Sequence, residues 1–191
     1  MLRLVLGFLP WIILAVFAGR WFISSLLLAF AVAAITTTRQ YWRGTPKILD
    51  TVTCVFFAGA LAAVAIVGWI PVAIHMTLLV NVTLTIIAWG SLLAGTPFTI
   101  QYAREQVPQE HWHSPIFIRI NQYITAAWGL DFLLSLLISL YKQTTGETNF
   151  VVNYAWMLFS VAAVLFTVYF PDWYKSRALR RLPQTAGHGS A

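Results

Sequence analysis

Long apolar runs separated by short polar segments extend along most of the chain. About 20 apolar residues in an α-helix, rising ~1.5 Å each, cross the ~30 Å hydrocarbon core of a bilayer. Such runs fall at residues 21–38, 48–67, 72–94, 118–140 and 150–170, and a shorter run at 4–18 precedes them. The pattern predicts an all-α fold, a polytopic transmembrane helical bundle of 5–6 spans that forms one domain over residues 1–170.

The first apolar stretch, residues 2–38, is too long for one transmembrane helix. A single helix of that length would extend for ~50 Å, and Gly19-Arg20 is the interruption that suits a corner. The run before this corner contains Pro10, so it is either a full span or a re-entrant hairpin. A cleaved signal peptide is a third interpretation, because Val16-Phe17-Ala18 resembles a cleavage site.

The composition agrees with a lipid environment. The 191 residues are 59% hydrophobic and 9% charged, whereas soluble domains carry roughly 25% charged residues. So few charges cannot cover a water-facing surface, which excludes an ordinary cytosolic enzyme, a disordered chain and a nucleic-acid-binding domain. Cys54 is the only cysteine, which excludes an intrachain disulfide and a thiolate metal site.

The basic residues lie between the apolar runs and sort to one side of the predicted membrane. Ten lie on the side of the N-terminus, and two, Arg20 and Lys142, lie opposite. Because cytoplasmic loops are enriched in Lys and Arg, we expect a multi-pass membrane protein with both termini cytoplasmic. If the first run is re-entrant, Arg3 lies on the other side of the membrane and the basic residues divide nine to three. The predicted orientation of the other runs is unchanged. Residues 171–191 form a basic cytoplasmic tail that we expect to be flexible.

Small side chains recur at a spacing of four in the run 21–38. Such stripes allow close approach of helix backbones, which matters in lipid because the hydrophobic effect does not drive helices together there. The stripe predicts packing within the bundle, and self-association through the same face is the alternative. Its members are Ser25, Ala29, Ala33 and Thr37.

Asp131 is the one acidic residue deep inside an apolar run. Counting back from Tyr141 places it ~15 Å down, near the bilayer midplane. A carboxylate at that depth costs ~2.5 kcal/mol or more on insertion scales, so it should face the interior. Its helix agrees, because at ~100° per residue a polar stripe falls within ~120° of arc. This stripe consists of Asn121, Thr125, Trp128, Asp131, Ser135 and Ser139.

A second polar stripe, Thr77, Asn81 and Thr85, lies in the run 72–94. This run is antiparallel to the run of Asp131, and counting from Pro71 gives Asn81 the same depth. We therefore predict that the two helices pack with Asn81 and Asp131 within hydrogen-bond reach. The candidate intramembrane site is either responsive to protons or ions, or a structural clamp that fixes helix register. It comprises Asp131, Asn81, Thr85 and Ser135.

The longest polar segment, residues 96–117, separates the fourth and fifth of the six runs. Thr96 followed by Pro97 reads as an N-cap and first helical residue, opening a short helix that ends before Pro108. Its apolar and charged residues divide between two faces, which predicts an amphipathic cytoplasmic helix. We expect this helix either to rest on lipid headgroups or to dock a partner, through Phe98, Tyr102, Arg104 and Trp112.

Motifs for catalysis and metal binding are missing from the sequence. His75 has no further ligand placed to join it, and His111-x-His113 beside Glu110 is a weak cation-binding pattern. There is no nucleophile elbow, phosphate-binding glycine loop or HExxH motif. We therefore expect no enzymatic activity, no metal site and no cofactor.

The order of several short motifs is similar to that of a known family. An apolar N-terminal segment with Phe8-Leu9-Pro10 precedes paired spans, and a basic tail closes the chain. Between them stand Thr96-Pro97-Phe98-x-x-Gln101, Trp112, Arg119-x-Asn121 and Ala127-Trp128. The chain resembles the bacterial intracellular septation protein A family and related uncharacterised polytopic inner-membrane proteins. The resemblance implies a multi-pass protein of the bacterial inner membrane with a non-enzymatic role in envelope maintenance or septation, through contacts with other membrane proteins.

Two other functions fit the residues. One is a small transporter or channel that uses Asp131 and Asn81, and the other is an accessory subunit of a larger membrane complex. A water-accessible cavity that reaches Asp131 would favour transport, whereas a dry, closed bundle would exclude it.

Overall fold

The computed structural model describes residues 2–147 and 149–180, and all regular elements in these ranges are helical. Five helices are long and apolar enough to cross a membrane. Many large apolar side chains on these helices point outward, as lipid requires of a transmembrane bundle. The chain is therefore an all-α, multi-pass membrane protein. The five helices are Leu9–Trp42, Ile48–Ile66, Met76–Leu93, Pro115–Thr145 and Trp156–Arg177.

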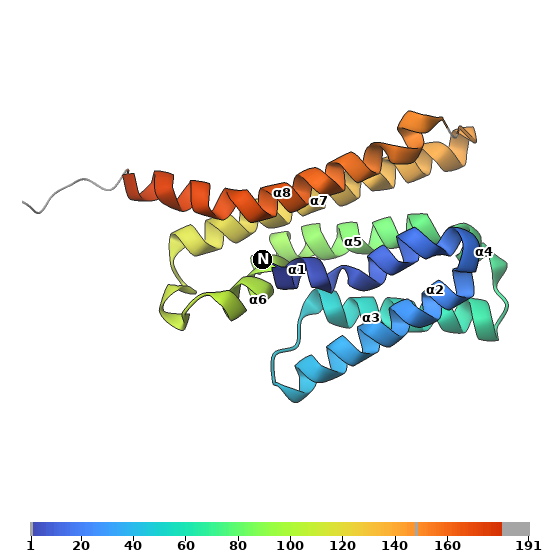
Figure 1. Ribbon diagram of the computed structural model, residues 1–191, viewed down its shortest axis with the longest axis horizontal. Helices are drawn as coiled ribbons and strands as arrows, with labels where there is room; N and C mark the ends of the chain where they lie inside the picture. Colours follow the sequence, from blue (N-terminus) through green and yellow to red (C-terminus); the bar gives the residue numbers. More distant parts are fainter. Residues whose placement is uncertain (1, 148, 181–191) are drawn as a thin grey trace, which may run out of the picture.

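The first candidate span is bent into two arms. Helix α1 (Leu2–Gly7) leads into α2 (Leu9–Trp42), in which Trp21 leaves helical geometry with φ −135° and ψ 63°. The chain doubles back at this bend (Figure 1), one residue beyond the predicted Gly19-Arg20 corner. We call residues 2–20 the first arm and residues 22–42 the second arm. At ~1.5 Å per residue the first arm is about 28 Å long, close to the ~30 Å thickness of the hydrocarbon core.

The second arm packs along α3 (Ile48–Leu61), which continues as a π-helical turn, η1 (Ala62–Ile66). The contact uses the predicted stripe of small residues, because Ser25, Ala29, Ala33 and Thr37 are all buried. A short helix, α4 (Ile70–Ile74), then precedes the long α5 (Met76–Leu93). The expected run 72–94 is thus divided at His75.

The segment between α5 and the next long helix folds inward. It consists of α6 (Phe98–Ala103), η2 (Arg104–Gln106) and η3 (Gln109–His111). The expected cap by Thr96 is wrong: Pro97 precedes the helix, and the Ser91 hydroxyl accepts the backbone N–H of Phe98 at 3.1 Å.

The last two long helices are α7 (Pro115–Thr145) and α8 (Phe150–Arg180), which pack against each other, while α5 packs along α7. Helix α7 begins at Ser114, whose side chain accepts the N–H of Phe117, and ends at Gly146 with φ 69°. Helix α8 continues through Pro171 to Arg180. Residues 171–180 of the predicted tail are therefore helical, and residues 181–191 lie outside the described range.

The start of α1 and the end of α8 lie at the same end of the bundle (Figure 1). We call this the basic end: it carries the N-terminus, residues 43–47, α6 and the C-terminal part of α8. The opposite end carries the α2 bend, α4 and the α7–α8 connection. This arrangement agrees with the predicted parity of the spans, with Arg20 and Lys142 in the segments that face away from the basic end.

Candidate functional site

A cavity of about 880 Å³ lies within the bundle, between the first arm, α4, α5, α7 and α8. One part of its wall is apolar and aromatic, formed by residues such as Phe8, Leu14 and Leu84. The other part is polar. It is lined by His75, Thr77, Asn81, Asp131, Ser135, Ser139, Lys142, Gln143 and Ser160.

The α7 wall of the cavity follows the polar stripe predicted from the sequence. Trp128, Asp131, Ser135 and Ser139 all line it, at the three- and four-residue spacing of one helix face. The remaining members of the stripe, Asn121 and Thr125, are buried away from the cavity. Thr99 of α6 donates to the Asn121 carbonyl at 3.0 Å and lies 2.8 Å from the Thr125 hydroxyl, which ties α6 to α7.

Asp131 faces the bundle interior, as predicted, and is 4% exposed. The Ser160 hydroxyl of α8 lies 3.2 Å from Oδ1 and 3.1 Å from Oδ2 of its carboxylate. A carboxylate offers about four lone-pair sites, so one shared hydroxyl leaves most of its acceptor capacity free. No cation of the described residues forms an ion pair with it.

Asn81 does not form the predicted hydrogen bond with Asp131 and instead contacts other residues of α7. The Asn81 amide donates to the Ser135 carbonyl at 3.2 Å and to the Ser139 hydroxyl at 2.8 Å. Asn81 therefore lies one to two helical turns nearer the opposite end than Asp131. The offset arises because α5 begins only at Met76 and α7 extends to Thr145, so both helix ends used for counting were misplaced. Asn81, Asp131 and Ser135 nevertheless line the same cavity.

Thr85 does not join this site. It is absent from the cavity lining, and its hydroxyl is buried with no hydrogen-bond partner.

The wall includes exposed residues that mark where the cavity opens. At the opposite end, Gln143 is exposed, and its amide nitrogen lies 2.6 Å from Nδ1 of His75. On the lipid side, Ile12 of the first arm is 45% exposed and Trp156 of α8 is 40% exposed. The cavity is therefore partly open, at its opposite-end residues and on the lipid side of the first arm and α8.

An aromatic cluster closes the cavity towards the basic end. Phe8 stacks on Trp128 with ring centroids 4.5 Å apart, and Phe132 lies 5.8 Å from Phe8 and 5.6 Å from Trp128. Phe98 of α6 meets the edge of Phe8 at 6.4 Å. The Trp128 indole N–H donates to the Thr167 hydroxyl of α8 at 3.0 Å, which fixes the orientation of its ring. We call Phe8, Trp128 and Phe132 the aromatic floor.

A second polar cluster lies beyond this floor, at the basic end, and sequence reasoning missed it. Asp50, in the first turn of α3, is 5% exposed and accepts from the Gln40 amide at 2.5 Å and the Tyr102 hydroxyl at 2.8 Å. Its backbone carbonyl accepts from the Thr37 hydroxyl at 3.0 Å. The available signal was an acidic residue directly inside an apolar run, three residues after Lys47.

Ion pairs connect this basic-end cluster to the first arm. Glu105 lies 2.7 Å from Nζ of Lys47 and 2.6 Å from Nη1 of Arg3. Lys47 is 6% exposed and its ammonium lies 4.5 Å from the centre of the Tyr102 ring. The cluster thereby joins the first arm, the start of α3 and the end of α6.

These contacts shift two pKa values in opposite directions. Burial, together with the charge and hydrogen bond of Asp50, raises the pKa of the Tyr102 hydroxyl far above its ordinary value. Burial raises the pKa of the Glu105 carboxyl, but the hydrogen bonds and charges of Lys47 and Arg3 outweigh it, so this pKa is lowered. Tyr102 therefore stays a hydrogen-bond donor while Glu105 stays ionised.

The expected membrane-surface face of α6 is wrong. Phe98 and Tyr102 are 0% and 2% exposed, because they pack into the core rather than onto headgroups. Arg104 and Trp112 remain at the surface, where the guanidinium lies 5.1 Å from the indole ring centre. The indole N–H of Trp112 donates to the Val107 carbonyl at 2.9 Å.

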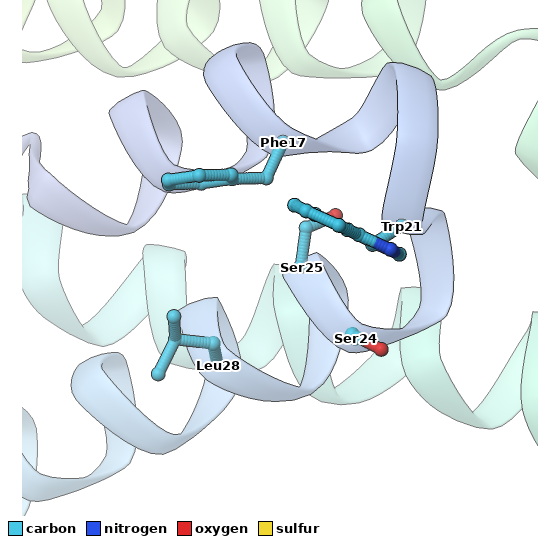
Figure 2. A pocket seen from close by; sticks show the side chains of 5 residues that line it. All are labelled: Phe17, Trp21, Ser24, Ser25 and Leu28. Atoms are coloured by element: carbon cyan, nitrogen blue, oxygen red, sulfur yellow. The ribbon is translucent and has the colours of Figure 1, made fainter.

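A smaller surface hollow of about 390 Å³ lies at the α2 bend. Figure 2 shows the rings of Phe17 and Trp21 beside Ser24, Ser25 and Leu28, all from α2. It holds no ionisable side chain. Among the described residues no group of three or more His, Cys, Asp or Glu side chains could hold a metal ion.

Comparison of the chain with protein-family models, with curated proteins and with solved structures finds no match.

Proposed function

We propose that this protein binds a small amphipathic molecule in the cavity beside Asp131 and moves it across the membrane. The single observation that carries the proposal is a cavity of about 880 Å³ that reaches a buried carboxylate inside a transmembrane bundle. Ligand sites are typically concave, mostly apolar and furnished with a few convergent polar groups. An ionisable residue within a span marks a substrate or ion pathway more often than a purely structural contact.

The shape of the cavity supports transport over simple storage. It opens towards the opposite end and towards lipid, and the aromatic floor separates it from the basic end. A carrier must close one side while the other is open, and the basic-end cluster of ion pairs supplies a second closure behind the floor. No catalytic step is part of this proposal.

The excess of Lys and Arg at the basic end supports a finer location. By the positive-inside rule this end is cytoplasmic, with the N-terminus and the end of α8 inside. The resemblance to the septation protein A family supports a location in the bacterial inner membrane. The cavity then opens outward. Labelling of single cysteines at each end in intact cells tests this orientation.

The transport proposal is tested by filling the cavity. Ser135 is 8% exposed and lines it, whereas Leu137 on the same helix is 53% exposed towards lipid. In proteoliposomes given a set of radiolabelled cationic, neutral and anionic amphipaths, saturable uptake of at least one supports the proposal. Ser135→Trp should abolish that uptake, and the matched control Leu137→Trp should leave it near the wild-type rate. Uptake that survives Ser135→Trp, or none with any compound, overturns it.

A role in the cell envelope through contacts with other membrane proteins is the second candidate. It is supported by the resemblance to the septation protein A family. It is also supported by α8, which packs on α7 and keeps Leu158, Val161, Leu165 and Tyr169 exposed. Site-specific photo-crosslinking from Leu165 in cells tests it: defined protein adducts support the role, and adducts with lipid alone contradict it.

A further inference from the structure

The charges of the cavity point to one class of ligand, and this inference rests on the proposed function. Among the described residues that line the cavity, Asp131 is the only acidic one. The two basic lining residues, His75 and Lys142, lie towards the opposite end. Lys142 follows Asp131 by three helical turns on α7, about 16 Å along the axis. The inner part of the cavity therefore holds one carboxyl group and no basic side chain among the described residues.

The immediate surroundings of Asp131 are incomplete for an ionised carboxylate. Among the described residues its hydrogen-bond partner is the Ser160 hydroxyl, shared between the two oxygens at 3.2 and 3.1 Å. A buried charge is costly unless it is paired. A positively charged group of a ligand would supply the missing partner, whereas a negatively charged group would be repelled.

The aromatic floor supplies the second half of such a site. Phe8, Trp128 and Phe132 line the same cavity as Asp131, and Asp131 neighbours Phe132 in the chain. Aromatic faces attract organic cations, and the attraction grows where water is excluded. The floor also offers a flat apolar surface to the body of a ligand. Because the Trp128 N–H is engaged by Thr167, the ring offers no competing donor there.

We infer that the ligand of this cavity is an organic cation with a large apolar body, whose positive group pairs with Asp131 and whose body lies against the aromatic floor. The apolar lining of Leu14, Phe22 and Leu84 accommodates the body. The exposed Ile12 and Trp156 at the lipid-facing side permit entry of a molecule that partitions into the membrane.

The test uses two probes of the same shape and opposite charge, tetraphenylphosphonium and tetraphenylborate. Binding is measured by protection of a single cysteine, Ser135→Cys in a Cys54→Ala background, from alkylation in detergent micelles; Cys54 is the only native cysteine. We expect the cation to protect Ser135→Cys at lower concentration than the anion. Adding Asp131→Asn should weaken protection by the cation about tenfold or more, and it should not weaken protection by the anion, because the repelling charge is removed. The control Ser139→Ala keeps the charge, so the preference for the cation should persist.

The outcomes separate the inference from the proposed function. Equal protection by both probes, unaffected by Asp131→Asn, overturns the cation preference but keeps a ligand cavity. Protection by the anion alone also overturns it. If neither these probes nor any amphipath of the uptake set protects Ser135→Cys, while the thiol itself reacts, the proposed function fails as well. A monodisperse elution profile of the Asp131→Asn protein shows that lost protection reflects charge rather than misfolding.

Discussion

The ring of Phe8 lies flat against that of Trp128, with centroids 4.5 Å apart and planes inclined by 21°. Phe8 stands at the junction of α1 and α2, whereas Trp128 belongs to the middle of α7. The stack therefore joins the first arm to the opposite side of the bundle. It also divides the interior, with the cavity of Asp131 on one side and the basic-end cluster of Asp50 on the other.

Removing one ring of this stack should open the cavity towards the basic end. Phe8→Ala deletes a ring that is 5% exposed, and such truncations cost about 3–5 kcal/mol in well-packed cores. We expect a lower melting temperature and reaction of Ser135→Cys with an impermeant maleimide from both sides of a vesicle. In the parent protein this reaction should occur from the opposite end alone.

The neighbouring Leu9 provides the control for this variant. It is 39% exposed, so Leu9→Ala should change neither melting temperature nor sidedness by much. If Ser135→Cys in the Phe8→Ala protein still reacts from the opposite end alone, the aromatic floor is not what closes the cavity towards the basic end.

The ion pairs of Glu105 should make stability depend on pH. Its folded-state pKa lies below the ordinary value of 4.5, so its contribution is complete above pH 4.5 and is lost as pH falls through the folded value. Glu105→Gln should lower stability at neutral pH by about 2 kcal/mol, less than a fully buried pair would. The Glu105 side chain is 20% exposed and that of Arg3 is 60% exposed, so water weakens these ion pairs.

Thermal unfolding at several pH values measures this effect. The difference in melting temperature between parent and Glu105→Gln should shrink as the solution is acidified. Glu110, whose side chain is 74% exposed, gives the matched control Glu110→Gln, with no comparable loss. A gap that is constant with pH would contradict the ion-pair explanation.

Tyr102→Phe removes one of two side-chain donors to the buried Asp50 carboxylate. A hydrogen bond to a charged group contributes about 1.5–3 kcal/mol, so stability should fall by that amount. In the parent the phenol has a raised folded pKa, so its stabilisation is complete below its ordinary value of 10.0 and declines above it. The parent should therefore lose stability more steeply than Tyr102→Phe in alkaline solution. Parallel denaturation curves would contradict this.

Gly7 is required for the close approach of α1 to Tyr102. A Cβ atom at Gly7 would lie 2.8 Å from the Tyr102 hydroxyl oxygen, and the ring has no free space because Tyr102 is 2% exposed. Gly7→Ala should be destabilising in the parent and less so in a Tyr102→Phe background. A double-mutant cycle on melting temperature measures this coupling, and strictly additive losses would contradict the contact.

Much of the fold follows from local properties of the chain. The length of each apolar run predicts a span, and Gly19-Arg20 predicts the corner within one residue of the bend at Trp21. The four-residue spacing of Ser25, Ala29 and Ala33 marks a packing face, which the structure buries against α3. The inward orientation of Asp131 follows from the cost of a carboxylate in lipid.

The partners of the polar residues were decided by tertiary structure. Counting along helices gives depth to about one turn, ~5.4 Å, whereas a hydrogen bond requires ~3 Å. Asn81 therefore donates a hydrogen bond to Ser139 rather than to Asp131. A small difference in the residue at which α5 begins was enough to displace the Asn81 side chain along the bundle. The sequence also could not predict that α6 packs into the core. The same amphipathic pattern fits a helix that lies on lipid headgroups and a helix that packs against other helices.

The sequence by itself determined the solvent of each helix face, because hydrophobic length and periodicity are properties of a single segment. Only the tertiary structure decided where helices stay apart to form a cavity, and which residues fold over Asp50 to bury it. Both depend on axial offsets and tilts between segments distant in the chain, and these are set by all packing contacts together.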